Sequence, residues 1–176
     1  KKPQKTNIDF KDLKKIKIED ALTKILSSPN HSNKSWVTSQ YDQSVMCDTL
    51  QKSGSDAAII RIHNKDKAIA VSVDSSANYC KSHPTLGGKQ IVCENWRNLI
   101  TVGARPLAIT NCLNFGNPEN EEIMGEFAEC LEGIKEACKF LNYPIVSGNV
   151  SFYNGTNKKN IYPTPVIGGV GLINKL

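Results

Sequence analysis

The fold is indicated most directly by one stretch, Tyr143-Pro-Ile-Val-Ser-Gly-Asn-Val-Ser-Phe-Tyr-Asn154. Its β-branched and aromatic residues predict a strand, and Pro144 suits the first position of a strand. We expect the strand to break at 147–149 and then to resume, because a glycine followed by an amide inside an apolar strand is typical of a bulge or of a ligand close to the backbone. A Gly-Asn turn that joins two strands is the alternative that these residues leave open.

The polar side chains of this stretch have the chemistry of a binding site. Asn149 and Ser151 are two residues apart, so a regular strand would project both from one face. The carbonyl oxygen of Asn149 can ligate a hard cation, and the hydroxyl of Ser151 can bond a phosphate or a sugar. Gly148 would let a ligand come close to the main chain.

Apolar periodicity predicts the other elements. Helices are expected over 18–28, 34–40, 84–102 and 118–141. Strands are expected around 45–50, 57–62, 68–74, 105–112 and 164–173. Asn117 should cap the longest helix, with Pro118 at its first position.

These elements predict an α/β (α+β) fold. Each long helix has one apolar stripe, which implies a mixed β-sheet with helices on one face. Strands such as 57–62 and 68–74 are largely apolar, so the other face of the sheet needs burial as well. The simplest solution is a half-barrel that pairs with a second sheet, and we therefore expect a domain of a larger protein.

Composition narrows the class of protein. At 176 residues the chain suits one domain with a sizeable core. Residues 1–17 hold seven lysines and two aspartates, which accounts for the whole net charge of +5, so we expect a basic linker or arm there and no nucleic-acid partner. There is no apolar run of about 18 residues for a membrane span, and no signal-peptide core. Six cysteines show no CxxC or zinc spacing, which favours a cytoplasmic protein.

Other motifs carry weaker signals. The three histidines fall in no recognisable catalytic or metal motif, and neither a Walker-type loop nor a nucleophile elbow occurs. Leu86-Gly-Gly-Lys-Gln90 is either a phosphate-cradling loop or a turn that leads into a helix. Three amides, Asn111, Asn114 and Asn117, lie at or just after the end of the strand at 105–112. We expect Asn114 and Asn117 to cap or turn the backbone, whereas the role of Asn111 is open.

Several segments together resemble one enzyme family. They are Ser27-Ser-Pro-Asn30, Gly54-Ser-Asp-Ala-Ala58, Gly103-Ala-x-Pro-Leu-Ala-Ile-Thr110, Cys112-Leu-Asn-Phe-Gly-Asn-Pro-Glu119, Ser147-Gly-Asn-Val-Ser151 and Tyr162-Pro-Thr-Pro-Val-Ile-Gly168. In this order they closely resemble the phosphoribosylformylglycinamidine synthases, in the synthetase subunit of the small, separate-subunit type. The resemblance covers roughly residues 18–176.

The resemblance implies a fold, a reaction and partners. Residues 43–176 would be the aminoimidazole ribonucleotide synthetase-like N-terminal domain of the second half of the enzyme, and 18–42 would be connecting helices. The enzyme converts formylglycinamide ribonucleotide, ATP and ammonia to the amidine, ADP and phosphate in purine biosynthesis, with Mg²⁺. The expected partners are the first half of the same enzyme, a glutaminase subunit that supplies ammonia and a small accessory subunit.

The resemblance also assigns residues. Gly148 matches a glycine that contacts ATP, Asn149 a magnesium ligand and Ser151 a substrate-binding serine. Asn111 stands where the family commonly has an ATP-binding aspartate, so ATP contact is expected there without the negative charge. Asp74 resembles an acid of an auxiliary nucleotide site.

The family's catalytic histidine belongs to the absent first half, so we expect no catalytic residue and no turnover from this chain alone. We expect the isolated domain to self-pair. The alternatives are a non-catalytic pseudo-subunit that closes the barrel, and another ATP-dependent synthetase or kinase of the same fold.

Overall fold

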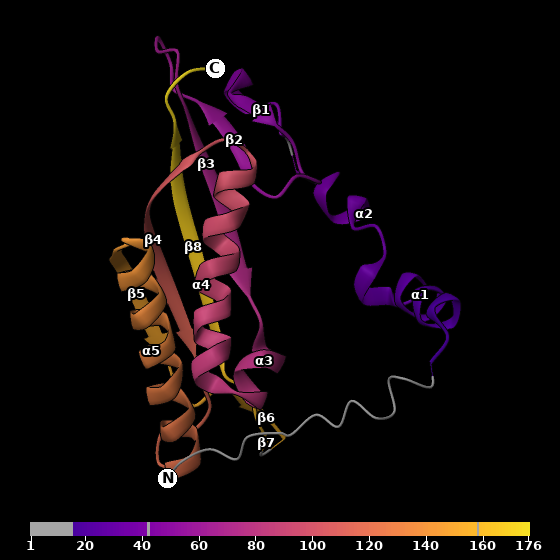
Figure 1. Cartoon of the computed structure of the whole chain (residues 1–176), viewed down its shortest axis with the longest axis vertical. Helices are drawn as coiled ribbons and strands as arrows, with labels where there is room; N and C mark the ends of the chain where they lie inside the picture. Colours follow the sequence, from indigo (N-terminus) through magenta and orange to yellow (C-terminus); the bar gives the residue numbers. More distant parts are fainter. Residues whose placement is uncertain (1–15, 42, 158) are drawn as a thin grey trace.

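The main sheet is mixed, as the strand pattern predicts (Figure 1). A computed structural model describes residues 16–41, 43–157 and 159–176. The six strands, in their order across the sheet, are β1 (Thr49–Gln51), β2 (Ala58–Arg61), β3 (Ala68–Ser75), β8 (Thr164–Ile173), β4 (Arg105–Asn114) and β5 (Ile145–Ser151). Strands β4 and β5 run parallel, and the other neighbouring pairs run antiparallel. A small ribbon of β6 (Gly155–Thr156) and β7 (Lys159–Asn160) follows β5.

Two long helices cover one face of this sheet (Figure 1). The helices are α1 (Ile18–Leu26), α2 (Ser35–Thr38), α3 (Ala77–Ser82), α4 (Pro84–Thr101) and α5 (Glu121–Leu141). Helix α4 packs on β3 and β8, and α5 packs on α4. The buried side chains of α4, α5 and the inward face of the sheet, among them Ile91, Ile109 and Ile167, form one apolar core. The predicted fold class is thereby confirmed.

The other face of the sheet is apolar and exposed. On β3, Ala68, Ala70 and Ser72 are buried and alternate with Ile69 and Val73, which are 37% and 67% exposed. Val170 on β8 pairs with Val71 and is 39% exposed on the same face. Such a surface is expected where a second layer packs in a larger assembly.

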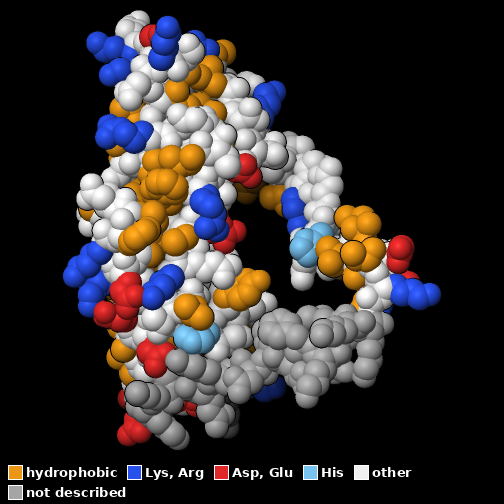
Figure 2. All heavy atoms as spheres, in the orientation of Figure 1, with side chains coloured by type: hydrophobic (Ala, Val, Ile, Leu, Met, Phe, Trp, Pro, Cys, Tyr) orange, Lys and Arg blue, Asp and Glu red, His pale blue; other side chains and the backbone are white. Residues whose placement is uncertain are grey.

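The N-terminal helices form an arm beside the sheet (Figure 1). Helix α1 has no buried residue, and Figure 2 shows apolar side chains gathered on this arm. The predicted basic start lies, up to residue 15, outside the described residues. In the described ranges, no helix combines the length and the apolar content that a membrane crossing requires.

Two elements near the start of the sheet differ from the prediction. The prediction of a strand at 45–50 is wrong for its first residues. Val45–Cys47 forms a 3-10 turn, in which Met46 and Cys47 have left-handed backbone conformations. Pairing with β2 begins only at Thr49. Helix α3 was not predicted, because its polar sequence has no apolar period and only Cys80 is buried.

The stretch at 143–154 also differs in detail. Strand β5 continues through Gly148 and Asn149, so neither the break at 147–149 nor the alternative Gly-Asn turn exists. The irregularity lies earlier, where Ile109 pairs with Ile145 but Thr110 pairs with Ser147. Helix α5 begins at Glu121 rather than Pro118, because the N-cap is Asn120, whose Oδ1 accepts a hydrogen bond from Glu122 N (2.9 Å).

Candidate functional site at the ends of β4 and β5

The parallel pairing of β4 and β5 brings the predicted site residues together. Asn111 pairs with Gly148, Cys112 with Asn149 and Asn114 with Ser151. These pairs lie toward the carboxyl ends of both strands, which is where open α/β sheets commonly bind ligands. The four residues predicted for ATP, metal and substrate therefore lie within a few positions of one another on adjacent strands.

Asn111 and Gly148 are in direct contact. A β-carbon on Gly148 would overlap the Asn111 Oδ1 and lie only 2.9 Å from the Asn111 main-chain oxygen. Asn111 is two residues from both Ile109 and Leu113, which are buried in the core, so its side chain lies on the same, helix-covered face as theirs. A glycine is required here because its neighbour's side chain fills the space.

Asn149 and Ser151 are on the opposite, open face. They are two apart in a continuous strand, and they pair with Cys112 and Asn114, which alternate with the core residues of β4. The predicted site thus occupies both faces of β5, which is the last strand of the sheet. A ligand that contacted all four residues would pass around the free edge or the end of this strand.

Two amides of the site have no partner within the described part of the chain. No hydrogen bond joins the side chain of Asn111 or of Asn149 to another described residue. By contrast, Asn114 donates to the main-chain oxygen of Thr164 (3.3 Å), and Asn117 Oδ1 accepts from Glu119 N (2.9 Å). The expectation that Asn114 and Asn117 bond the backbone is confirmed, but Asn117 forms a turn and not the cap of α5, which is Asn120. No described residue bonds the side chains of Asn111 and Asn149, so a ligand could.

Asp74 lies in a polar network that the sequence did not reveal. Its carboxylate accepts hydrogen bonds from Ser72 Oγ (2.7 Å), Asn95 Nδ2 (2.8 Å) and Asn98 Nδ2 (2.8 Å). Tyr143, the residue two before β5, donates its hydroxyl hydrogen to Asn95 Oδ1 (2.8 Å). Burial, with the nearby charge of Asp74, raises the pKa of Tyr143 well above its usual range. The network therefore connects the end of β3 with the start of β5.

The glycine pair at 87–88 is not a phosphate loop. Both glycines lie inside α4, and the Gly87 N–H donates to the His83 main-chain oxygen (2.8 Å). A β-carbon on Gly88 would overlap the main-chain oxygen of Cys130 on α5. The pair lies at the end of the first turn of α4, so the alternative of a turn that leads into a helix is confirmed, and its lack of side chains allows α4 to lie close to its helical neighbours.

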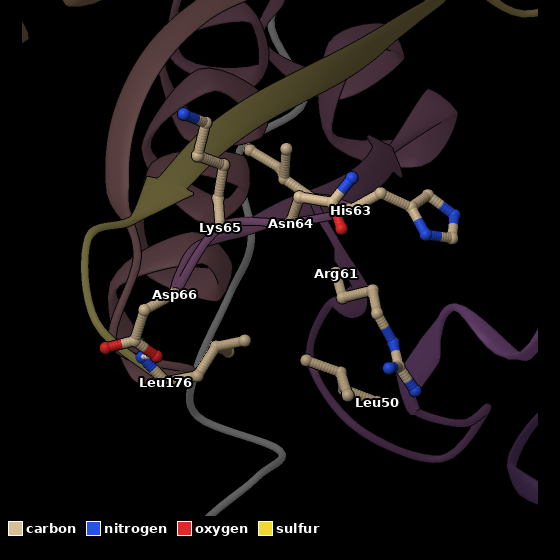
Figure 3. A pocket seen from close by; sticks show the side chains of 8 residues that line it. Leu50, Arg61, His63, Asn64, Lys65, Asp66 and Leu176 are labelled. Carbon is tan, nitrogen blue, oxygen red and sulfur yellow. Dashed lines mark hydrogen bonds between the residues drawn. The ribbon is translucent and has the colours of Figure 1, made fainter.

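Figure 3 shows a hollow at the other end of the sheet. Its volume is about 690 Å³, and it is lined by residues of the β2–β3 connection and by the C-terminal Leu176, whose N–H donates to Asp66 Oδ1 (3.2 Å). It contains none of the predicted site residues. We place the candidate site at β4 and β5 because the unpartnered amides and the close glycine contact are found there.

The site could supply one ligand to a magnesium ion but could not hold the ion by itself. No group of three or more histidine, cysteine or acidic side chains in the described ranges is arranged to hold a metal ion. Asn149 offers one neutral oxygen on an exposed strand. Magnesium commonly takes one or two protein ligands together with water and substrate phosphates, so a single amide oxygen is compatible with a shared ion.

Comparison with known proteins places the chain in a family. Residues 54–173 match the family model described as AIR synthase related protein, N-terminal domain. The chain belongs to this family. Subunit PurL of phosphoribosylformylglycinamidine synthase from Pelagibacter ubique (strain HTCC1062) is 60% identical over 173 residues, which cover 98% of this chain and 24% of that protein. The resemblance seen in the motifs is thereby confirmed.

Solved structures agree with this assignment. The PurLQS structure from Thermotoga maritima matches with a TM-score of 0.76 at 36% identity, over 81% of this chain and 24% of that one. PurL of Thermotoga maritima complexed with ATP and with FGAR matches at 36% identity, with TM-scores of 0.72 and 0.70, over 81% of this chain and 24% and 23% of those chains. The chain therefore spans about a quarter of the length of these relatives.

Proposed function

We propose that this chain is the N-terminal sheet domain of the second half of a phosphoribosylformylglycinamidine synthase, and that it completes an ATP and substrate site. The observation that carries the proposal is the β4–β5 register, which gathers Asn111, Gly148, Asn149 and Ser151 at adjacent strand ends. The unpartnered amides of Asn111 and Asn149 support it. So do the PurL relatives, of which the Thermotoga maritima protein is solved with ATP and with FGAR.

Each residue would have a separate task. Gly148 would let the nucleotide approach the main chain, and Asn111 would bond ATP through an amide that can both donate and accept. Asn149 would hold a shared magnesium ion, which offsets the charge of the phosphates when bound. Ser151 would bond the ribonucleotide. Binding and orientation are thus the contributions of this domain to the reaction of formylglycinamide ribonucleotide, ATP and ammonia.

The open apolar face indicates how the domain would be used. Ile69, Val73 and Val170 would be covered by the homologous N-terminal domain of the first half, which gives a closed barrel. A glutaminase and a small accessory subunit would supply ammonia to the assembled enzyme in the cytoplasm. Residues 1–17 would be a basic linker or arm, residues 18–42 the connecting helices, and the domain alone would be inactive.

One observation favours a second candidate, a non-catalytic pseudo-subunit. The described residues contain no group of three or more acidic, histidine or cysteine side chains that could hold a metal, and the resemblance implies that the neutral Asn111 stands where an ATP-binding aspartate is expected. A scaffold would need only the apolar face. The third alternative, another synthetase or kinase, is supported by fold alone, since AaThiL matches with a TM-score of 0.59 at 18% identity.

The deciding experiment measures ADP release by the full-length parent protein with formylglycinamide ribonucleotide, ammonia and Mg-ATP. We expect Asn149→Ala to lose more than about tenfold in turnover, or about 1.4 kcal/mol of transition-state stabilisation. Asn120→Ala is a matched control, because it removes one amide whose Oδ1 bonds Glu122 N in the cap of α5 and which is not among the proposed site residues.

The nearly isosteric Asn149→Asp separates the two candidates. A scaffold should tolerate it, whereas at a metal and phosphate site it adds a charge and changes the Mg²⁺ dependence. Wild-type turnover and Mg²⁺ dependence in both Asn149 variants would support the scaffold. An inactive wild-type parent would contradict the enzyme assignment itself.

A further inference from the structure

Asn154 is held over Ser151 by the loop that follows β5. The Asn154 Nδ2 donates to the main-chain oxygens of Ser151 (2.9 Å) and Phe115 (3.0 Å), and it lies 3.1 Å from Ser151 Oγ. Main-chain oxygens only accept hydrogen bonds, so the nitrogen of this amide must face them. The orientation of the side chain is therefore fixed by two independent acceptors.

The backbone of the loop is built to bring Asn154 into this place. Tyr153 adopts a left-handed conformation (φ 59°), which is unfavourable for a residue with a β-carbon and turns the chain back toward the strand. The Tyr153 N–H donates to Gly116 O (3.0 Å), and the Asn154 N–H donates to Phe115 O (3.2 Å). Because these bonds tie the loop to the segment after β4, Asn154 keeps its place without a bound ligand.

The amide of Asn154 determines how the Ser151 hydroxyl can bond. A hydroxyl has one hydrogen and two acceptor lone pairs. The side-chain nitrogen of Asn154 has two hydrogens, one directed at Phe115 O and one shared between Ser151 O and Ser151 Oγ at 3.1 Å, so the shared hydrogen occupies one lone pair of the Ser151 hydroxyl. The reverse bond, from Ser151 Oγ to Asn154 Oδ1, is long at 3.4 Å. The hydroxyl hydrogen is thus left available to a group outside the loop.

We propose that Asn154 is a positioning residue that sets the Ser151 hydroxyl as a donor toward an oxygen-rich, anionic substrate. This inference rests on the proposed function, in which Ser151 binds the ribonucleotide. The ligand atom would be an accepting oxygen, such as a phosphate oxygen. An amide suits this task better than a carboxylate, because a carboxylate would accept the hydroxyl hydrogen itself and would repel an anion.

The test uses steady-state kinetics of the full-length parent protein. Asn154→Ala should raise the KM for formylglycinamide ribonucleotide about tenfold, as expected for a lost hydrogen bond to a charged group, and should change the KM for Mg-ATP less than about twofold. Asn154→Asp keeps the shape of the side chain but reverses the bond, so its KM for the ribonucleotide should rise further. Asn120→Ala, which removes the cap of α5, should leave both constants unchanged.

A double variant shows whether Asn154 acts through Ser151. The KM for the ribonucleotide in Ser151→Ala/Asn154→Ala should equal that of Ser151→Ala alone, because no hydroxyl remains to be positioned. If the KM of the double variant rose by the product of the two single increases, the two residues would act independently and the inference would be overturned. An equal rise of both KM values in Asn154→Ala, which indicates a general disturbance of the loop, would also overturn it. If Asn154→Ala fails to fold, the isosteric Asn154→Asp carries the test, and an unchanged KM in it would overturn the inference.

The outcomes separate this inference from the proposed function. If Ser151→Ala leaves the KM for the ribonucleotide unchanged, the substrate role of Ser151 is wrong, and the proposed site fails with it. If Ser151→Ala raises that KM while Asn154→Ala and Asn154→Asp do not, the site stands and only the positioning role is wrong.

Discussion

Asn111 and Gly148 face each other across the parallel pair of β4 and β5, and the amide oxygen of Asn111 fills the space that a β-carbon on Gly148 would need. Each residue therefore constrains the other. Asn111 can keep its side chain on the core side of the sheet only while its neighbour is a glycine. The two residues expected to contact ATP thus depend on each other sterically as well as chemically.

The first prediction concerns the substitution Gly148→Ala. The added methyl group would force Asn111 to move, and overpacking of this kind costs about 1–3 kcal/mol of unfolding free energy. Urea denaturation of the isolated chain measures this loss. Gly168→Ala is the control, because its β-carbon would meet only Thr110 Cγ2 at 3.1 Å, and it should cost less. Equal costs for the two changes would contradict the steric role of Asn111.

The second prediction concerns the substitution Tyr143→Phe. It leaves the buried Asn95 Oδ1 without its partner, which should lower the unfolding free energy by about 1–3 kcal/mol. The exposed Tyr79 is the control, since Tyr79→Phe removes a hydroxyl that water solvates. If Tyr143→Phe changed the unfolding free energy no more than Tyr79→Phe does, the hydrogen bond to Asn95 would not contribute to stability.

The third prediction follows from the raised pKa of Tyr143, which burial and Asp74 cause. Above about pH 10 the unfolded chain loses the phenolic proton and the folded chain keeps it. The unfolded state then binds fewer protons, so the stability supplied by Tyr143 falls as the pH rises. We expect the unfolding free energy of the wild type to fall more between about pH 9 and pH 11 than that of Tyr143→Phe. Urea denaturation at both pH values measures this difference. Parallel pH profiles would be the contrary result.

The fourth prediction concerns Gly133 on α5. Alanine in place of a helical glycine normally stabilises by about 1 kcal/mol. At Gly133 the sign should reverse, because a β-carbon would overlap the main-chain oxygen of Thr85 on α4. Ala128→Gly, at an exposed position of α5, gives the ordinary helix effect for comparison. A stabilised Gly133→Ala would mean that α4 and α5 can separate at no cost.

The fifth prediction concerns the open face of the sheet. The isolated chain should self-pair through it, because Val73 and its neighbours expose a continuous apolar surface. Sedimentation equilibrium should show a dimer in the wild type and a shift toward monomer in Val73→Glu. Phe140→Glu, which changes an 88% exposed ring on α5 on the helix side, is the control and should keep the dimer. A wild type that is monomeric at all concentrations would refute self-pairing.

The parts of the fold that follow from local pattern could be predicted from the sequence. Strand β8 has the predicted bounds 164–173, because its glycines and β-branched residues lie between clear turn residues. The helix-covered face follows from the single apolar stripe of α5. The turn at Met46 was missed, because left-handed residues other than glycine have no local signal.

In the candidate site, too, local features could be predicted from the sequence, whereas features that depend on distant parts of the chain could not. The sequence names Gly148, Asn149 and Ser151 as candidates, but it predicts a break at 147–149, whereas the structure places all three in one continuous strand. The sequence also does not predict that Asn111 and Asn149 lie on opposite faces, because this depends on the register between β4 and β5. Asn154 and the Tyr143–Asn95–Asp74 network were also missed, since their partners are distant in the chain.

Within the part of the chain that the structure describes, strand β5 has one neighbour, β4, and ends the sheet on that side. Its outer row of main-chain groups therefore pairs with no other described strand. An outermost strand can detach while the strands behind it stay closed, so amide hydrogen exchange should be faster along Ile145–Ser151 than along β8 at the centre. Local opening of this strand would take Gly148, Asn149 and Ser151 out of the sheet together, and binding of a ligand there would slow that exchange by holding the strand closed.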